Sequence, residues 1–198
     1  LGEQKLTPWI KETGQDRWII YLGLTLSCTL LYFLGGMSFF DAVSHSMSTV
    51  AIGGFSTHNE SIGYFNSTFI ELICIIFMLL SACSFTLHYF AIYKKKPLKY
   101  FYDPEFRFFL IVLSIVFILT ILISILSGNE SAPSIKEVAF QSVSTVTTTG
   151  FSISSNQDWP LSISFLMLIG AFIGACSGSV GGGLSLIHIS EPTRRRGI

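Results

Sequence analysis

Four long apolar stretches constrain the fold of this chain more than any other feature of its sequence. They run from Trp18 to Gly35, from Thr68 to about Tyr93, from Phe106 to Leu126 and from Leu161 to about Cys176. A helix needs roughly 20 mainly apolar residues to cross about 30 Å of hydrocarbon, so each stretch is a candidate span. Only 12% of the residues are charged, against about a quarter in an ordinary soluble domain. The sequence therefore predicts an all-α integral membrane protein, and it contains no basic stripe of the kind that binds nucleic acid.

The distribution of basic residues predicts the orientation of the spans. Lysine and arginine collect in the N-terminal segment 1–17 and in the loop 94–105, whereas the connections 55–67 and 127–140 contain only Lys136. Cytoplasmic loops carry such an excess of basic residues, so the two basic segments are expected in the cytoplasm. The two remaining connections are then expected on the external side of a multi-pass membrane protein.

A twelve-residue pattern occurs twice in the chain. Residues 46–57 match residues 142–153 at seven of twelve positions, at an offset of 96 (142 − 46 = 96). Each copy follows a span that should run outward and precedes one that should run inward. We therefore divide the chain into two repeat units, 18–93 and 106–183, and internal repetition of this kind is typical of transport proteins.

A short helix is predicted in each unit, over 38–50 and 134–146. Each segment begins with a serine suited to an N-cap, and an acid follows three residues later, where the helix dipole favours it. These residues are Ser38 and Asp41 in the first unit and Ser134 and Glu137 in the second. A dozen helical residues span only about 18 Å, so each is expected to be a re-entrant half-helix with its partly negative end near the membrane centre.

The glycine- and threonine-containing loops 51–55 and 147–151 follow these half-helices. An extended backbone at membrane depth is tolerated inside protein or along a water-filled path. Its free carbonyls can replace the hydration shell of a monovalent cation. We therefore predict that the two loops are parts of one ion-selectivity filter. The alternative is a pair of external turns in which Gly54 and Gly150 supply a positive φ, and the repetition favours the filter.

Several motifs together resemble one family. The stretches "STVAIGGFSTHNESIGYF", "DPEFRFFLIV", "VTTTGFS" and "AFIGACSGSVGGG" resemble the membrane subunit of the bacterial Trk/Ktr potassium-uptake systems, the TrkH-like proteins. That family is similar to potassium channels and has four span–pore-loop–span units, of which this truncated chain would hold the second and third. The resemblance implies K⁺ as the transported substrate. The residues that it implies as carbonyl ligands are Ile52, Gly53, Gly54, Thr148, Thr149 and Gly150.

A glycine-rich stretch at 177–183 should interrupt the fourth span, because glycine costs about 1 kcal/mol relative to alanine inside a helix. By resemblance it is an intramembrane gate loop below the filter. The gate residues implied are Gly178, Ser179, Gly181, Gly182 and Gly183. The alternative is that glycine and serine here only permit close helix packing.

The resemblance implies further properties. It predicts passive or ion-coupled K⁺ uptake without bond chemistry or a cofactor, in a bacterial inner membrane. The full-length protein would be a homodimer with a TrkA-like nucleotide-binding regulatory subunit in the cytoplasm. Two units cannot enclose an ion, so the chain alone should not conduct. Residues 184–198 depart from the family and are interpreted as a non-native tail. A Na⁺-permeable relative and a non-transporting membrane scaffold are the alternatives.

Four titratable residues outside these motifs receive weaker predictions. His45 is expected to pack behind the filter or to lie in solvated surroundings, and His58 to lie in a solvated loop. Glu71 is near the outer end of a span, where it either reaches water or has a function. For His88 we expect a hydrogen-bonded position at the membrane interface.

Overall fold

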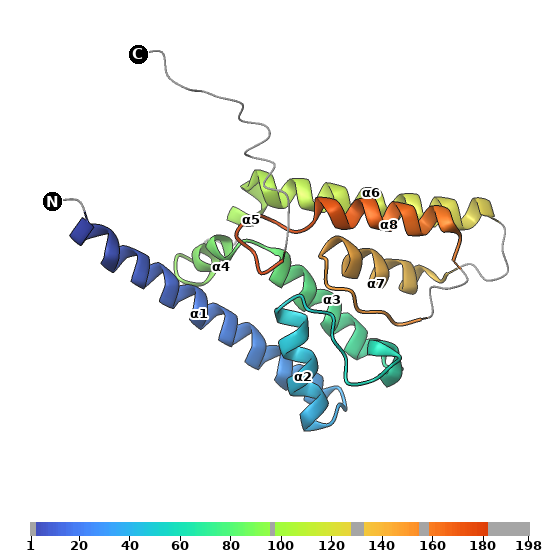
Figure 1. Ribbon diagram of the computed structural model, residues 1–198, viewed down its shortest axis with the longest axis horizontal. Coiled ribbons are helices and arrows are strands. Elements are labelled where there is room, and N and C mark those ends of the chain that lie inside the picture. The colour runs from blue at the N-terminus through green and yellow to red at the C-terminus, as the bar shows by residue number, and fades with distance from the viewer. Residues whose placement is uncertain (1–2, 96–97, 128–132, 155–158, 182–198) are drawn as a thin grey trace, which may run out of the picture.

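The computed structural model describes residues 3–95, 98–127, 133–154 and 159–181, which fold into helices and connecting loops (Figure 1). The elements in chain order are α1 (Glu3–Leu34), α2 (Phe39–Val50), the 3₁₀ helix η1 (Ser61–Phe65), α3 (Thr68–Ala82), α4 (Phe85–Ile92), α5 (Lys99–Tyr102), α6 (Pro104–Ser127), α7 (Ile135–Val146) and α8 (Leu161–Ile173). The predicted all-α membrane fold is confirmed.

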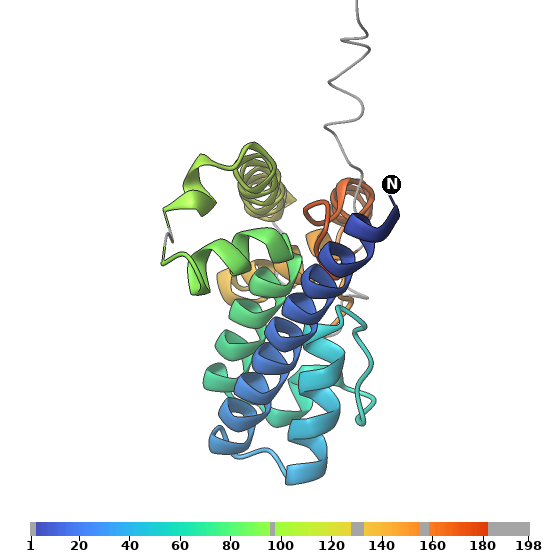
Figure 2. The ribbon, with the colours of Figure 1, turned by 90° about the vertical axis from the view of Figure 1, so that its left-hand side faces the viewer.

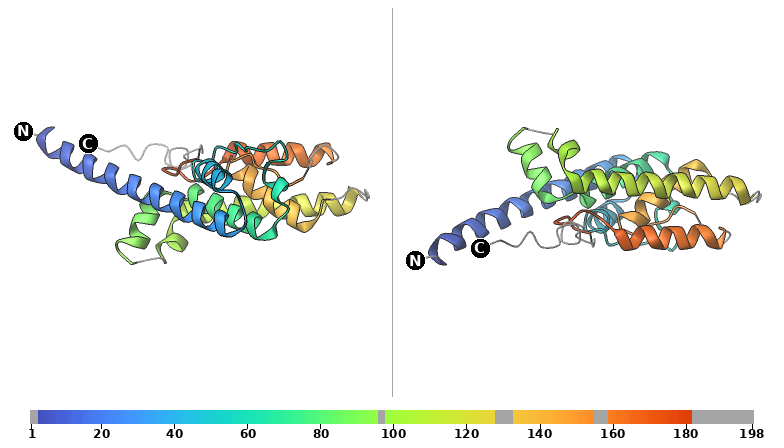
Figure 3. Two further views of the ribbon diagram at one scale, coloured as in Figure 1. Left: turned by 90° about the horizontal axis from the view of Figure 1, so that it is seen from below. Right: turned by 90° about the horizontal axis from the view of Figure 1, so that it is seen from above.

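The two repeat units are visible as two groups of helices. In the first, α1 packs against α2 and α3, as Figure 2 shows from the side; in the second, α6 packs against α7 and α8. Both views of Figure 3 place α6 and α8 in the same half of the molecule, while α1 extends from the opposite end. Contacts between α3 and α7 join the units.

The half-helices form where the caps predict them. Helix α2 covers 39–50 and α7 covers 135–146, so both bounds differ by the same offset of 96 (135 − 39 and 146 − 50). The Ser38 side chain accepts a hydrogen bond from the Asp41 N–H. Ser134 and Glu137 form a full capping box, in which each side chain bonds the other residue's backbone. These bonds satisfy first-turn donors that have no partner within the helix.

The first span begins earlier in the structure than the apolar pattern indicates. Helix α1 starts at Glu3, fifteen residues before the predicted Trp18 (18 − 3), and its apolar part long enough to cross a membrane is Gly14–Leu34. Helix propensity is separate from polarity, so the polar residues before Trp18 continue the helix. Helix α6, at Pro104–Leu126, is the second stretch of sufficient length and apolarity.

The second predicted span is not one continuous helix: it consists of two helices that are long and apolar enough to cross a membrane only when taken together. Helices α3 and α4 meet at Cys83–Ser84 with a bend of 101°. Both residues are extended, because the end of α3 is hydrogen-bonded to the 174–181 segment from the other unit. The fourth span is also shorter than expected, since α8 has 13 residues and ends at Ile173.

Two buried clusters hold the units together. One combines side chains of α1, α2 and α3 with Phe140, Val143 and Phe151 of the second unit. The other combines Ile52 and Ala82 of the first unit with side chains of α6, α7 and α8. Each core therefore includes residues of both units, which fixes the loops after α2 and α7 relative to each other.

Candidate ion-conducting site

The loops 51–55 and 147–151 lie against each other. A methyl group added at Gly54 would overlap the carbonyl oxygen of Thr149, and it would lie 3.2 Å from the carbonyl carbon of Gly150. Farther along the same path, Gly63 N–H donates to the Ser152 carbonyl at 3.2 Å. Two stretches that are 96 residues apart in sequence thus meet backbone to backbone, and Gly54 has no room for a side chain.

The backbone follows the same course in both loops. Ile52 and Gly54 have φ of 54° and 68°, and their counterparts Thr148 and Gly150 have φ of 63° and 90°. The residue between each pair does not have a positive φ. A left-handed conformation is strained for a β-branched residue such as isoleucine or threonine. Strain of this kind costs about 1–3 kcal/mol and is concentrated at functional sites.

The N–H groups of the loops bond back to the preceding helices. Gly53 N–H donates to the Ser48 carbonyl and Thr149 N–H to the Ser144 carbonyl, each at 2.8 Å and at equivalent positions of α2 and α7. In the same way Ile52 N–H donates to Thr49 and Thr148 N–H to Thr145.

Six carbonyls of the two loops have no such partners. None of the six accepts a hydrogen bond from any residue that the structure describes, whereas the Phe151 carbonyl accepts one from the Ser144 hydroxyl at 2.7 Å. The six are those of Ile52, Gly53, Gly54, Thr148, Thr149 and Gly150. Backbone acceptors without partners at the C-terminal, partly negative ends of two helices can coordinate a cation.

The segment 174–181 lies below these loops, on the side of the α3–α4 bend. Helix α8 ends at Gly174, which has a φ of 71°. A methyl group added at Gly181 would contact the Ile52 side chain at 3.0 Å and the Thr147 carbonyl at 3.3 Å. Of the predicted gate residues, Gly178, Ser179 and Gly181 lie in this segment, whereas Gly182, Gly183 and the tail 184–198 lie outside the described residues.

Three backbone–backbone hydrogen bonds attach the 174–181 segment to the first unit. Cys176 N–H donates to the Ala82 carbonyl at 3.1 Å, and Val180 N–H donates to the Ser81 carbonyl at 3.3 Å. In return, Phe85 N–H donates to the Gly178 carbonyl at 3.1 Å. The segment therefore occupies the break between α3 and α4, directly beneath the loops.

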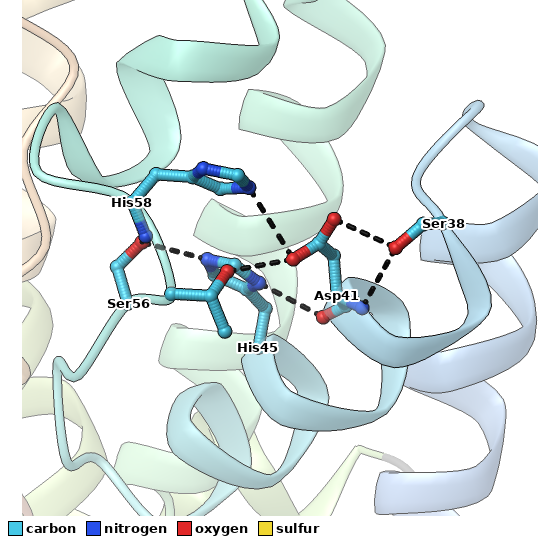
Figure 4. A network of polar contacts seen from close by, with 6 residues as sticks. Ser38, Asp41, His45, Ser56 and His58 are labelled. Atoms are coloured by element: carbon cyan, nitrogen blue, oxygen red, sulfur yellow. Dashed lines mark hydrogen bonds and ion pairs between the residues drawn. The ribbon is translucent and has the colours of Figure 1, made fainter.

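A polar network braces the outer side of the first loop (Figure 4). His45 is fully buried, and its Nδ1–H donates to the Asp41 carbonyl at 2.8 Å. Its Nε2 lies 2.8 Å from the Ser56 hydroxyl, which thus donates to the neutral ring. The ring also stacks on Phe151 of the second loop, with centroids 6.2 Å apart. His45 therefore packs behind both loops, which was one of its two predicted positions.

His58 lies in a loop whose neighbouring residues Thr57 and Asn59 are exposed, as expected, but its own ring is packed and only 26% exposed. Its ring stacks on Tyr64 with centroids 3.6 Å apart, and its Nε2 is 3.3 Å from Asp41 Oδ1. Thr57 and Ser38 donate to the two Asp41 oxygens at 2.6 and 2.7 Å. These hydroxyl hydrogen bonds hold the pKa of the Asp41 carboxyl below its usual value.

This lowered pKa predicts how the loop 56–58 responds to acid. A group whose folded-state pKa is depressed contributes stability above its unfolded-state pKa and loses it as pH falls through the folded-state pKa. We expect hydrogen exchange at the His58 amide, corrected for the intrinsic rate, to stay protected down to about pH 4 and to accelerate below it. In Asp41→Asn this acid-induced step should be absent. Protection that is lost above about pH 5 in the unaltered chain would contradict the prediction.

A charged pair links the two units at their outer ends. Lys136 Nζ, in the first turn of α7, lies 2.9 and 3.1 Å from the two carboxylate oxygens of Glu71 in α3. The Glu71 side chain is only 6% exposed. Glu71 therefore does not reach open water, which was one of the two predictions for it. Its partner Lys136 could not be identified from sequence spacing.

Comparison with known proteins identifies the family to which this chain belongs. Residues 1–194 match the TrkH family, which is described as cation transport proteins. The chain belongs to the TrkH family. It is 47% identical over 190 residues to the Trk system potassium uptake protein TrkH of Halomonas elongata, and 45% identical over 192 residues to the protein of the same name from Escherichia coli K12. These matches cover 96% of the chain and about 39–40% of the length of those TrkH relatives.

A solved structure of the family has the same fold. The crystal structure of the potassium transporter TrkH from Vibrio parahaemolyticus matches with a TM-score of 0.86 at 45% identity. The match covers 96% of this chain and 42% of that one. The predicted resemblance is thus confirmed, including the conclusion that this TrkH-family chain corresponds to less than half of its relatives.

Proposed function

We propose that this chain contributes two of the filter segments of a potassium-uptake pore, 51–55 and 147–151. The observation that carries the proposal is the contrast between the loop N–H groups, which are bonded to α2 and α7, and six loop carbonyls that accept no hydrogen bond from the described residues. These carbonyls lie where the two loops meet. Backbone carbonyls replace the water around a dehydrated K⁺. The coordinating residues are those named above, and no side chain has to reach the ion.

The 174–181 segment, continued by Gly182 and Gly183, is the proposed gate. Its position below Ile52 and Thr147 supports a role in obstructing the path that leaves the filter. A segment without regular helical hydrogen bonds moves more readily than the core helices around it. Displacing it from the α3–α4 break opens that path.

Two filter segments do not surround an ion, so the chain alone should not conduct. The exposure of the two filter phenylalanines supports this conclusion. Phe151 is fully buried against the first unit, whereas its counterpart Phe55 is 81% exposed. Phe55 therefore lies on the side where a further unit of the same kind would pack. The full-length protein is proposed to be a homodimer in the bacterial inner membrane, regulated by a nucleotide-binding subunit on the side of the basic loop.

A chimera tests the function directly. Residues 3–181 replace the matching segment of the Vibrio parahaemolyticus TrkH, and the product is expressed in a bacterium that lacks its own K⁺ uptake. We expect growth in K⁺-limited medium, and K⁺ flux that exceeds Na⁺ flux in proteoliposomes. Equal fluxes of the two ions would favour the Na⁺-permeable alternative. Normal membrane insertion without any flux would favour the scaffold.

A further inference from the structure

His88 and Tyr100 form a hydrogen-bonded bridge that the proposed filter and gate do not use. His88, in α4, is almost completely buried, and its Nε2–H donates to the Leu80 carbonyl at 2.8 Å. Since a carbonyl can only accept, the proton is on Nε2 and Nδ1 is left as an acceptor. The Tyr100 hydroxyl, in α5, lies 2.7 Å from that Nδ1 and donates to it.

The bridge ends at the place where the 174–181 segment is attached. The Leu80 carbonyl is followed by those of Ser81 and Ala82, which accept from Val180 and Cys176 of that segment. All three carbonyls belong to the last turn of α3, just before the 101° bend. A change in the bond to Leu80 therefore acts on the same turn that holds the segment.

Helix α5 is in turn fixed to its neighbours on the side of the basic loop. Lys99 Nζ lies 3.0 Å from the centroid of the Phe90 ring in α4, and the Tyr100 ring packs against Phe106 at the start of α6. Tyr100, through His88, thus gives this short loop helix a polar connection to the end of α3.

We propose that Tyr100 and His88 are positioning residues, forming a latch through which α5 sets the position of the 174–181 segment against the end of α3. The effect of the latch on transport rests on the proposed gate, but its effect on the position of the segment does not. Any partner that displaces α5 would act on the segment through this connection.

The alkylation rate of Cys176 reports on the position of the 174–181 segment, because this cysteine is buried within it. We would measure alkylation of the purified chain in detergent micelles by N-ethylmaleimide and follow each cysteine separately by mass spectrometry. In Tyr100→Phe, which keeps the ring and removes the hydroxyl, Cys176 should react about two- to tenfold faster, the change expected from losing one partly buried hydrogen bond. Cys28 and Cys74, fully buried in the core of the first unit, should keep their rates.

The matched control is Tyr102→Phe, since Tyr102 lies on the same helix and is 80% exposed. In Tyr102→Phe, Cys176 should be alkylated at the same rate as in the unaltered chain. In a His88→Leu background, Tyr100→Phe should have no further effect, because residues that act through one bond are not additive. An unchanged Cys176 rate in Tyr100→Phe, equal acceleration of all four cysteines, or additive effects would each overturn the latch.

Measuring K⁺ flux distinguishes a failure of the latch from a failure of the proposed gate. In the chimera, Tyr100→Phe should raise basal K⁺ flux as it raises Cys176 reactivity. Faster alkylation with unchanged flux would support the latch and reject the segment as a gate.

Discussion

Gly54→Ala should abolish potassium transport by the chimera while leaving its membrane insertion intact. The new methyl group would overlap the Thr149 carbonyl oxygen, and alanine disfavours the φ of 68° found at this position. Relieving the overlap has to move a proposed ligand. We expect flux to fall by roughly a hundredfold, the order of loss that follows when preorganised groups shift by about 1 Å. Tracer uptake of rubidium into proteoliposomes measures it.

Substitutions at two other glycines distinguish the effect of the overlap with the Thr149 carbonyl from the effect of backbone strain. Gly150 has a φ of 90° but no atom within 4 Å of an added methyl group, so Gly150→Ala should lower flux by only about tenfold. Gly36 has a φ of 99°, is equally unobstructed and lies outside both loops, so Gly36→Ala should leave flux nearly unchanged. Comparable losses in all three variants would mean that strain, and not the position of the Thr149 carbonyl, determines transport.

Reversing the charge of the buried Glu71 should strongly destabilise the protein. Glu71→Lys places a second ammonium group beside Lys136 in a site where the Glu71 side chain is 6% exposed. Breaking a buried pair costs about 3–5 kcal/mol, and we expect about 2–4 kcal/mol here because Lys136 is half exposed. Reversible unfolding in mixed micelles measures the free energy.

The reverse change provides the rescue. Glu71→Lys combined with Lys136→Glu restores opposite charges, so the double variant should recover most of the lost free energy of unfolding. Glu60→Lys makes the same substitution at an exposed position and should change the free energy of unfolding by no more than about 0.5 kcal/mol. If the double variant is as unstable as Glu71→Lys alone, the pair does not join α3 to α7 as described.

Local sequence signals predicted the half-helices and the loops that follow them. The caps at Ser38 and Ser134 are contained within four residues, and the 96-residue offset relates the bonds that Gly53 and Ile52 make to α2 to those that Thr149 and Thr148 make to α7. What sequence reasoning missed depends on contacts between distant residues. The bend at Cys83 requires hydrogen bonds from a segment more than 90 residues away, since Cys176 binds Ala82. Glu71 finds Lys136 only after the two units pack, and no periodicity encodes that contact.

For Ile52 and Thr148, the sequence predicted the position in the loops but not the positive φ. Neither residue type favours that conformation, so propensity indicates the opposite. The signal was indirect: both residues precede, by two positions, a glycine that the repeat aligns. The residues were correctly placed in the loops by that alignment, while their backbone strain became visible only in the structure.

The shared backbone of the two loops bears on how this protein changes over evolutionary time. Residues 51–53 and 147–149 differ at all three positions, yet their main chains take the same course. Substitutions that keep each glycine and the left-handed torsion angles would then leave the two main chains alike even where their residues differ. A comparison of residue identities alone understates how alike the two loops are.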